Sequence, residues 1–429
     1  MLQHNNNNRN VSFYNLKKNI RGSSTHLIVG IDVAKEKHDA FFGTANGKTL
    51  LKHFSFKNTF EGFTSFLLKT ESIKSRHGLE EVVIALEPTA NYHKPLGEFL
   101  IKNGHHLVLV SPGAAKKNRE LLTGRWDKSD NNDPANIADL TSQGKFLFYD
   151  FPTEPIRDLK ALLSLKRKLK KDEHSRRMRI RNHLLAQYFP ELEAHFGRFD
   201  LENLAVVKWL LDPKEISDLD FASFYKQITI ANRGARQKNH LESIWRVAEN
   251  SIGCEVGEAA RYEGRLLVDA LRLTQESIKQ TDAKIKSICI DMPEYACLLS
   301  IPGFGPVISG MTLGAIGDPH RFSSGKQLLK MVGLDLSASR SGKSSDNAIT
   351  KISKKGTAEL RYGLYQAAMV ASTKNGLFVG YLDRLIKGRE REKGIKKKMR
   401  VKLSAKMLII AWTLMKNMEL FDPSRISLS

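Results

Sequence analysis

Two apolar runs that each end in a carboxylate constrain this chain more than any other feature of its sequence. The run HLIVGIDV (His26–Val33) contains Asp32, and the run EVVIAL (Glu81–Leu86) is followed at once by Glu87. Short apolar runs bounded by polar segments predict strands that are buried on both faces of a sheet. A carboxylate at the end of a buried strand needs a compensating partner, so Asp32 and Glu87 are candidates for a functional site.

The surrounding sequence predicts an α/β domain over residues 25–150. Segments Asp39–Thr44 and Leu50–Phe56 are spaced as a hairpin across an Asn-Gly turn. The other predicted elements are helices at Phe60–Ser75 and Asn91–Asn103 and a strand at His106–Val110. Three hairpin-linked strands, a helix, a strand, a helix and a strand follow the order of the RNase H fold. The first and fourth strands are neighbours there, which would bring Asp32 and Glu87 side by side.

The segment KSDNNDPAN adds two further carboxylates, Asp130 and Asp133. Their spacing of three places both on one face of a helical turn, and Pro134 suits the first turn of a helix. Four converging carboxylates need a positive partner, and hard oxygen ligands suit Mg²⁺ or Mn²⁺. Two such ions can assist an in-line phosphoryl displacement. Taken singly, Asp130 is also read as a helix cap, Asp133 as a solvated first-turn acid and Glu87 as a strand-end acid at a turn.

The sequence of the first predicted hairpin is also compatible with a kinase. GIDVAKEKHDA is also similar to the first phosphate-binding hairpin of actin-like ATPases and sugar kinases. That reading needs a later Asp-x-Gly hairpin and glycine-rich adenosine contacts, and the sequence has neither. A formal charge of +22 fits a kinase poorly as well.

The charge balance points to a polyanionic partner, of which nucleic acid is the commonest. Lys and Arg total 68 against 46 Asp and Glu. Residues 157–181 hold eleven basic and three acidic side chains, and residues 389–406 hold nine and two. The candidate nucleic-acid-binding residues of these runs are Lys166, Arg167, Lys170, Arg176, Arg177, Lys396, Lys397 and Lys398. A run of this kind is also compatible with a solvated face, and contacts to the DNA backbone confer no sequence choice.

The remaining bulk features favour a cytoplasmic protein. Three cysteines without metal-ligand spacing make a disulfide framework and a zinc ribbon unlikely. Residues 1–24 are polar and Asn-rich and predict a disordered arm rather than a signal peptide. The apolar stretch Leu403–Met415 is too short to span a bilayer, so no membrane partner is expected.

Residues 151–292 predict an α-helical, coiled-coil middle region. Pro155–Tyr188 has the pattern of a long basic helix. A seam of steps of three and four follows at Leu271, Thr274, Ile278, Thr281, Ile285 and Ile288. Between them, about 189–258 is an insertion with helical pieces such as Phe221–Ile228 and Leu241–Val247, to which the sequence assigns no role.

Residues 293–421 predict a mostly α C-terminal domain. LSIPGFGPVIS (Leu299–Ser309) matches a helix-hairpin-helix in which Gly303 and Gly305 form a turn that can face a phosphate, although a plain helix–helix connection is the alternative. Further on, SGKSS is not a Walker A loop, because Ser337 stands where that motif requires glycine. Two interpretations remain for this segment. It is either a flexible polar loop or a loop that holds a phosphate, with Ser341 as a nucleophile and Arg340 and Lys343 beside it.

Several of these motifs, in their order, resemble a known family. ALEPTANYHKPL, KSDNND and the series SIPGFGP, IGD, KQL, GLD, SGKS, KKG and LRYGLYQAA are similar to the DEDD-type insertion-sequence transposases, the "one-ten" family related to the Piv invertases. The resemblance covers about 26–150 and 293–385. It implies a RuvC-like, RNase H-fold domain joined by a coiled coil to a C-terminal transposase domain.

The resemblance also implies site residues and partners. Asp32, Glu87, Asp130 and Asp133 match the family's metal-binding tetrad, and Ser341 matches its nucleophilic serine, which forms a phosphoserine intermediate with DNA. Partners would be donor and target DNA, a noncoding guide (bridge) RNA and further copies of the chain in a dimer or tetramer. The place of action would be the prokaryotic nucleoid.

The sequence departs from the family's pattern in two places, and two alternative functions stay open. The middle region is longer than in compact members, and Asp335-Leu336 stands where many members have a residue followed by proline. The alternatives are a RuvC-like endonuclease that hydrolyses branched DNA with water and a non-catalytic nucleic-acid-binding protein.

Overall fold

The computed structural model describes residues 6–123, 133–197, 200–229, 231, 234–337 and 351–425. Its contacts divide the chain into two compact units. The first comprises Met1–Thr153 with His320–Ser323, and the second comprises Glu154–Pro319 with Ser324–Ser429. Within the described residues, no helix has the length and apolar character that crossing a membrane requires.

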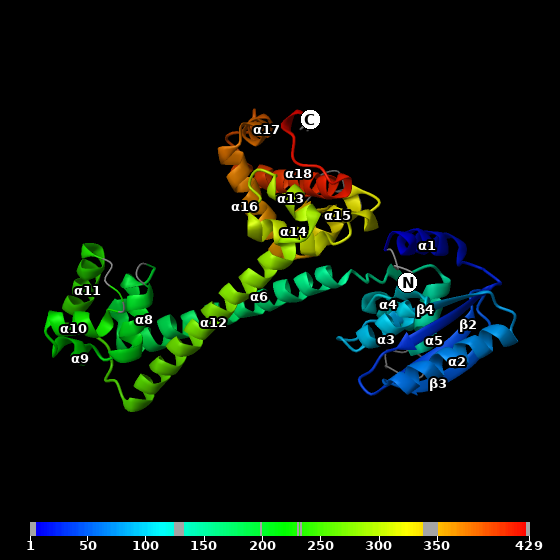
Figure 1. Cartoon of the computed structure of the whole chain (residues 1–429), viewed down its shortest axis with the longest axis horizontal. Helices are drawn as coiled ribbons and strands as arrows, with labels where there is room; N and C mark the ends of the chain where they lie inside the picture. The colour runs from blue at the N-terminus through cyan, green and yellow to red at the C-terminus, as the bar shows by residue number, and fades with distance from the viewer. Residues whose placement is uncertain are drawn as a thin grey trace. The chain divides into compact units, whose positions relative to one another are not determined.

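The first unit is a mixed six-stranded sheet between two layers of helices (Figure 1). Its strands are β1 (His26–Asp32), β2 (Lys37–Thr44), β3 (Thr49–Lys57), β4 (Glu81–Glu87), β5 (His106–Leu109) and β6 (Leu147–Phe148). Its helices are α1 (Asn6–Asn19), α2 (Phe60–Arg76), α3 (His93–Lys102), α4 (Pro112–Thr123) and α5 (Asp133–Ser142). The strand order is β3-β2-β1-β4-β5-β6; β1, β4 and β5 run parallel, and β2 and β6 run antiparallel to their neighbours. The predicted strands and helices of this region are confirmed to within a few residues.

The pleat of the sheet sorts the β1 side chains between the two helical layers. Leu27, Val29 and Ile31 share a core with α2 and α3. The alternate residue Ile28 lies in a second core with α1, α4 and α5. Both faces of the central strands are therefore buried, which explains their nearly continuous apolar sequence.

The N-terminal segment differs from the disordered arm expected over residues 1–24. Helix α1 covers one face of the sheet, and Leu16 and Ile20 are buried there at 7% and 0% exposure. Lys17 donates to the Phe146 carbonyl at 3.2 Å, and Arg9 donates to the Tyr149 carbonyl at 2.9 Å. The sequence of α1 has few apolar residues, so tertiary packing rather than helix periodicity orders it.

In the second unit, α6 (Glu154–Arg179) and α12 (Glu258–Ile290) form an antiparallel pair. Lys166 contacts Asp282, whereas Arg179, further along α6, contacts Glu263, earlier on α12. The predicted seam is confirmed for Leu271, Thr274, Ile278, Thr281 and Ile285, which are buried. Cys289 takes the last buried position instead of Ile288. The basic helix continues past α6 as a π-helical segment, Ile180–Leu185, and α7 (Ala186–Tyr188).

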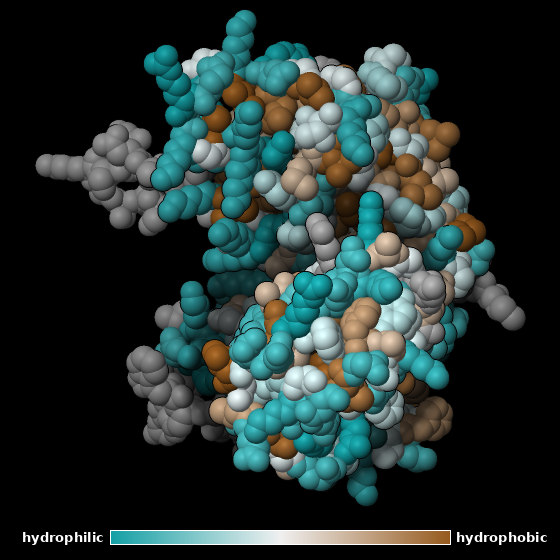
Figure 2. All heavy atoms as spheres, turned by 90° about the vertical axis from the view of Figure 1, so that its left-hand side faces the viewer, coloured by the Kyte–Doolittle hydropathy of each residue, from teal (hydrophilic) through white to brown (hydrophobic). Residues whose placement is uncertain are grey.

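The insertion predicted at about 189–258 packs into a helical cap on this pair. It contains a 3-10 segment, Pro190–His195, and helices α8 (Asp200–Trp209), α9 (Pro213–Ser217), α10 (Phe221–Ile228) and α11 (Ala235–Ala248). Phe189, Phe224 and Leu241 share its core with Val268 and Leu271 of α12. Figure 2, which faces this end of the molecule, shows a largely hydrophilic surface with scattered hydrophobic side chains.

The C-terminal region of this unit is mostly helical. Its helices are α13 (Pro293–Leu299), α14 (Pro306–Ile316), α15 (Gly325–Val332), α16 (Ala358–Lys374), α17 (Gly376–Ile386) and α18 (Ile395–Asn417), with short 3-10 segments at Pro319–Arg321 and Pro423–Arg425. Helix α18 packs against α13, α16 and α17. A two-stranded antiparallel ladder, β7 (Leu336–Ser337) with β8 (Lys351–Ile352), lies between α15 and α16 in the sequence.

The packing of α1 predicts that Ile20→Ala destabilises the first unit. Removing a fully buried isoleucine side chain leaves a cavity and costs about 2–5 kcal/mol. Urea unfolding followed by circular dichroism measures the loss. Val11→Ala is the matched control, because Val11 is 63% exposed on α1, the helix that Ile20 follows. Equal stability of the Ile20→Ala protein and the control would contradict this packing.

Candidate functional site

Asp32 and Glu87 lie at one register on neighbouring parallel strands. Asp32 ends β1, Glu87 ends β4, and the two residues are paired in the ladder. Both follow the alternation that places Ile28 of β1 and Val83 of β4 in the α4–α5 core, so both face that layer. Both are half-buried. The predicted pairing of these two carboxylates at the carboxyl ends of adjacent strands is confirmed.

Gly30 decides how closely α5 approaches the same face. A Cβ on Gly30 would lie 2.1 Å from the Pro134 carbonyl oxygen and 2.6 Å from the Ala138 nitrogen. The first turns of α5 therefore lie directly on β1, two residues before Asp32. This contact brings Asp133, the first residue of α5, to the layer that Asp32 and Glu87 face.

Asp133 is buried and held by an arginine. Its side chain is 2% exposed, Oδ1 accepts a hydrogen bond from Arg119 Nε at 2.8 Å, and Arg119 Nη2 forms an ion pair with the same oxygen at 2.6 Å. Arg119 belongs to α4. A buried carboxylate is stable only with such charge-assisted partners. The sequence did not single out Arg119, because a lone arginine on a polar helix has no distinguishing pattern.

A buried polar cluster fixes α4 to α5 beside this ion pair. Asn118 Nδ2 donates to Asn136 Oδ1 at 2.8 Å and to Asp139 Oδ2 at 2.7 Å. Asn136 Nδ2 donates to the Ala115 carbonyl at 2.8 Å. Asn118 and Asn136 are 6% and 4% exposed. The two helices that flank residues 124–132 are thus locked together by hydrogen bonds as well as by apolar packing.

Asp130, the fourth predicted carboxylate, lies outside the described residues. Among the residues that are described, no group of three or more His, Cys, Asp or Glu side chains lies close enough to hold a metal ion. The structure therefore unites Asp32 with Glu87 by register and places Asp133 on the same side of the sheet.

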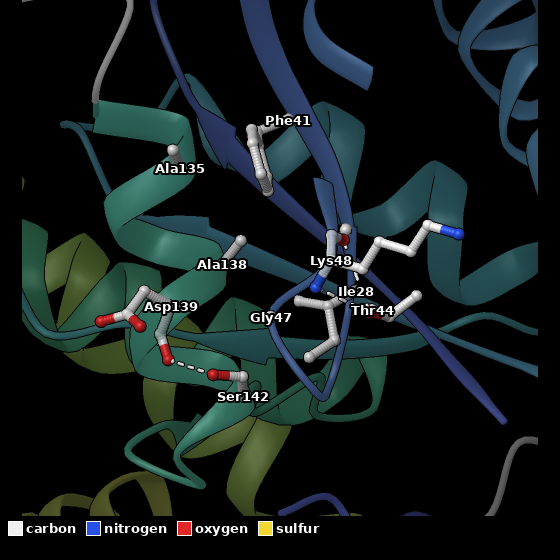
Figure 3. Close-up of a pocket in the computed structure, with 10 residues that line it drawn as sticks. Ile28, Phe41, Thr44, Gly47, Lys48, Ala135, Ala138, Asp139 and Ser142 are labelled. Carbon is white, nitrogen blue, oxygen red and sulfur yellow. Dashed lines mark hydrogen bonds between the residues drawn. The ribbon is translucent and has the colours of Figure 1, made fainter. Parts of the chain in front are cut away.

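A small pocket of the first unit lies away from these carboxylates. Figure 3 shows it between α5 and the β2–β3 hairpin, with Phe41, Lys48, Ala135, Ala138 and Asp139 among its walls. None of Asp32, Glu87 and Asp133 belongs to its described lining. The candidate site is therefore an edge of the sheet and not this pocket.

The segment with the predicted nucleophile begins and ends on the β7–β8 ladder. Ser341, Arg340 and Lys343 lie outside the described residues. Ser337 pairs with Lys351, so the two ends of the segment between them are side by side. Asp335 reinforces this base, because its carbonyl accepts from the Ser353 nitrogen at 2.8 Å and its carboxylate accepts from the Ser353 hydroxyl. The sequence predicted a loop at this place but not the short ladder that closes it.

The two glycines of the predicted hairpin have different surroundings. Gly303 has a φ of +89°, and a Cβ there would lie 2.4 Å from the Ala367 carbonyl of α16. Close packing and backbone conformation therefore explain Gly303 without any ligand. Gly305 precedes α14 in an extended conformation, and a Cβ there would meet no described atom within 4 Å.

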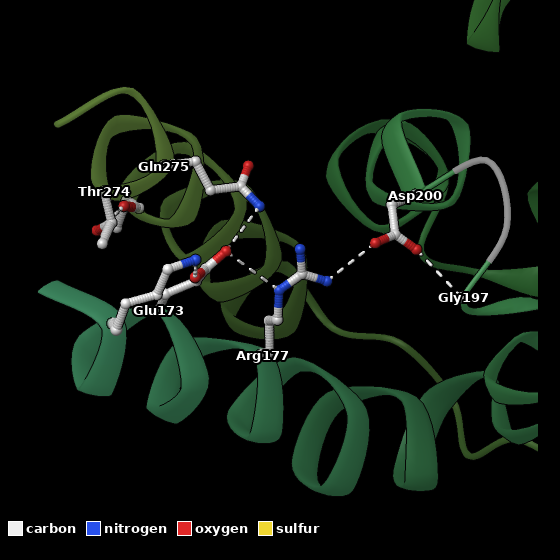
Figure 4. Close-up of polar contacts among 8 residues, drawn as sticks. Glu173, Arg177, Gly197, Asp200, Thr274 and Gln275 are labelled. Atoms are coloured by element: carbon white, nitrogen blue, oxygen red, sulfur yellow. Dashed lines mark hydrogen bonds and ion pairs between the residues drawn. The ribbon is translucent and has the colours of Figure 1, made fainter. Parts of the chain in front are cut away.

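Most of the predicted basic residues on α6 have acidic partners within the chain. Lys166 contacts Asp282 at 2.5 Å, and Arg167 contacts Glu359 at 3.5 Å. Lys170 donates to Glu173 at 2.9 Å. Figure 4 shows Glu173 accepting from Gln275 and contacting Arg177, which also reaches Asp200. These pairs fasten α6 to α12, α8 and α16. Arg176 has no ion-pair partner in the described part of the chain.

The second basic run is more exposed. Lys396, Lys397 and Lys398 occupy the first turn of α18, are exposed and have no ion-pair partner among the described residues. Their positive charge lies at the positive end of the helix dipole, which is unfavourable without an anion nearby. The charge of this surface is thus less compensated by ion pairs than that of the α6 run.

A buried histidine lies beneath the turn that follows Asp32. His38 is 0% exposed, its Nδ1 accepts from the Ala34 nitrogen at 3.3 Å, and its ring stacks on Phe63. Burial lowers the pKa of His38 below its usual value, against a smaller raising effect of Asn58. The imidazole is therefore neutral in the folded protein at pH 7.

The close packing at Gly30 predicts that Gly30→Ala displaces α5 from β1. Overpacking of this kind costs about 1–3 kcal/mol or more in the free energy of unfolding. Urea unfolding of the full chain measures it. Gly113→Ala is the control, because Gly113 lies on the neighbouring α4 and the nearest atom to an added Cβ is 3.8 Å away. A Gly30→Ala protein as stable as the control would contradict the contact.

The burial of His38 predicts a loss of stability in mild acid. Its folded pKa is lowered, so the unfolded chain binds the proton first as the pH falls below about 6.5. Stability due to neutral His38 is present above that pH and is lost as the pH falls through the folded pKa. The free energy of unfolding of the His38→Leu protein should therefore fall less between pH 7 and pH 5 than that of the wild type. Identical slopes would contradict this.

Comparison with known proteins gives matches over both units. Residues 29–190 match the model of DEDD transposases of the IS110 type, described as a transposase. Residues 295–382 match the transposase family of IS116, IS110 and IS902. The first match includes Asp32, Glu87, Asp130 and Asp133, and the second includes Ser341.

Two curated relatives agree with these matches. An uncharacterised protein of insertion element IS116 from Streptomyces clavuligerus is 23% identical over 412 residues, which is 92% of this chain and 96% of the relative. The pilin gene-inverting protein of Moraxella bovis is 29% identical over 158 residues, 36% of this chain and 48% of that protein. With both family models matched in order and a relative aligned over nearly its whole length, the chain belongs to the IS110-type transposases and recombinases of insertion sequences.

Proposed function

We propose that this transposase cuts and rejoins DNA with a serine nucleophile, Ser341, assisted by divalent metal at Asp32, Glu87, Asp130 and Asp133. The observation that carries the proposal is the register of Asp32 with Glu87 on adjacent parallel strands, under the helix that begins at Asp133. The strand order β3-β2-β1-β4-β5 with this polarity supports an RNase H-like, RuvC-like fold for the first unit.

The four proposed ligands fit a divalent cation by their chemistry. All four side chains offer carboxylate oxygens, the ligands that Mg²⁺ and Mn²⁺ prefer. Asp32 and Glu87 face one side of the sheet at one register, so neither needs to leave its strand to share an ion. When bound, the ion would stabilise charge on the phosphate under attack.

Ser341 would act on the DNA backbone. Its Oγ forms a bond to phosphorus, one bond between phosphorus and a sugar oxygen breaks, and the departing sugar hydroxyl gains a proton in place of the one that Ser341 loses. The resulting phosphoserine keeps the energy of the diester, so a hydroxyl of another DNA end can reverse the step and rejoin strands. The β7–β8 ladder supports this role, because it holds the two ends of the 338–350 segment together.

DNA binding would rest on the exposed lysines of α18 and on the turn before α14. Lys396, Lys397 and Lys398 can track a phosphate backbone, and the open space beside the Gly305 Cα suits a phosphate at the start of α14. Arg340 and Lys343 would hold phosphate beside Ser341, with Arg176 as a further contact. The ion pairs of Lys166, Arg167, Lys170 and Arg177 assign these residues to the protein's own architecture in its free state.

Backbone contacts do not select a sequence. A noncoding guide RNA that pairs with donor and target DNA would supply that selection. Because the tetrad and Ser341 belong to different units, a dimer or tetramer would permit one copy to supply the carboxylates and another the serine. Such a protein would act at the prokaryotic nucleoid.

The test uses purified full-length protein, Mg²⁺ and end-labelled DNA spanning the boundaries of the element. Ser341→Ala should abolish covalent protein–DNA adducts and strand joining, measured on denaturing gels. Ser345→Ala is the matched control from the same 338–350 segment. Asp32→Asn and Glu87→Gln should each lower adduct formation at least about 100-fold, since each removes a ligand of a charge-stabilising site.

Two outcomes would overturn this mechanism. Cutting by Ser341→Ala without adducts would identify a water-using endonuclease of branched DNA. Full recombination by Ser341→Ala would remove any role for the serine. Sequencing RNA that copurifies with the protein tests the guide: a single species matching DNA beside the gene supports it, and a cell-wide mixture contradicts it.

A further inference from the structure

We infer that Arg119 is a positioning residue of the metal site, holding Asp133 by one carboxylate oxygen so that the other is left for the ion. The inference rests on the proposed function, because it concerns the same carboxylates. It assigns a role to a residue on α4, outside the four acids.

The first reason is burial. Asp133 is 2% exposed, and a carboxylate so far from water requires a compensating charge. Arg119 supplies it through a hydrogen bond from Nε at 2.8 Å and an ion-pair contact from Nη2 at 2.6 Å, and its own side chain is only 18% exposed. Solvent therefore screens this pair far less than an exposed one.

The second reason is which oxygen is used. In a fork-to-fork pair, two guanidinium nitrogens meet the two oxygens of a carboxylate. Here Nε donates to Oδ1, and Nη2 makes its ion-pair contact with the same oxygen. Among the described residues, no hydrogen bond ends on Oδ2 of Asp133. The carboxylate is thus fixed in orientation while one oxygen keeps its capacity to bind a cation.

The third reason is that α4 and α5, the helices that carry Arg119 and Asp133, are held in place by other contacts. The residue before Arg119 is Asn118, whose side chain bridges Asn136 and Asp139 of α5. Helix α5 in turn lies against β1 at Gly30. The ion pair therefore joins two rigid helices, and partners of this kind orient metal ligands.

A purely structural ion pair makes a different prediction. It would stabilise the chain equally with and without metal, and its loss would leave metal affinity unchanged. A positioning residue changes the affinity itself, because an unoriented carboxylate must be ordered when the ion binds.

The experiment measures Mn²⁺ binding by the full chain without DNA, using electron paramagnetic resonance of free Mn²⁺. Arg119→Met should raise the dissociation constant about 10–100-fold, as loss of an orienting partner does in other metal sites. Arg119→Lys should also bind more weakly than wild type, because one ammonium cannot reproduce the two-nitrogen contact. Arg76→Met is the control: it removes one positive charge from the exposed end of α2 in the same unit.

The outcomes separate this inference from the proposed function. Affinity that is unchanged or tighter in Arg119→Met, when Asp32→Asn with Glu87→Gln weakens binding, overturns the role of Arg119 alone. Binding that is unchanged in the Asp32→Asn, Glu87→Gln protein overturns the metal site itself. If circular dichroism shows that Arg119→Met does not fold, Arg119→Lys decides: wild-type affinity in that folded protein overturns the inference, and weaker binding supports it.

Discussion

The contact between α5 and β1 at Gly30 is the constraint on which the rest of the site depends. Because glycine has no Cβ, the Pro134 carbonyl can lie against the strand, and the helix begins over the carboxyl end of the sheet. Asp133 is the first residue of that helix, and Asp32 lies two residues beyond Gly30. One missing methyl group thus brings acids from distant parts of the sequence to one side of the sheet.

Charged side chains find their partners in different ways in the two units. In the first, the buried Asp133 meets Arg119, and the carboxylates on β1 and β4 stay half-buried. In the second, basic side chains of α6 meet acids on α8, α12 and α16. The overall surplus of +22 therefore overstates the number of cations that are available to DNA. The exposed lysines at the start of α18 are the clearer candidates, since none of them forms an ion pair with a described acid.

The local sequence pattern predicted many of the strands and helices, and its failures have physical reasons. The apolar runs that end in Asp32 and Glu87 form the expected neighbouring strands, because residues buried on both faces of a sheet leave little doubt about their conformation. Helix α1 was missed, because it is polar along most of its length and is ordered by contacts of Leu16 and Ile20 with a core formed elsewhere. Arg119 was missed for a related reason, since only the packing of α4 on α5 makes it the partner of Asp133. The sequence could not pair the basic side chains of α6 with acids, because one partner, Glu359, lies 192 residues from Arg167, and their role in nucleic-acid binding stays a prediction.

The sequence by itself determined which carboxylates end the central strands, where the long paired helices run and to which family of motifs the chain is similar. These features are local, set by the alternation of apolar and polar residues and by short motifs in a fixed order. Only the tertiary structure decided which acids share a register, which arginine holds Asp133 and which cations are already neutralised. Those relations join residues that are distant in the chain, and they arise from the packing of helices on a sheet, which no local pattern records.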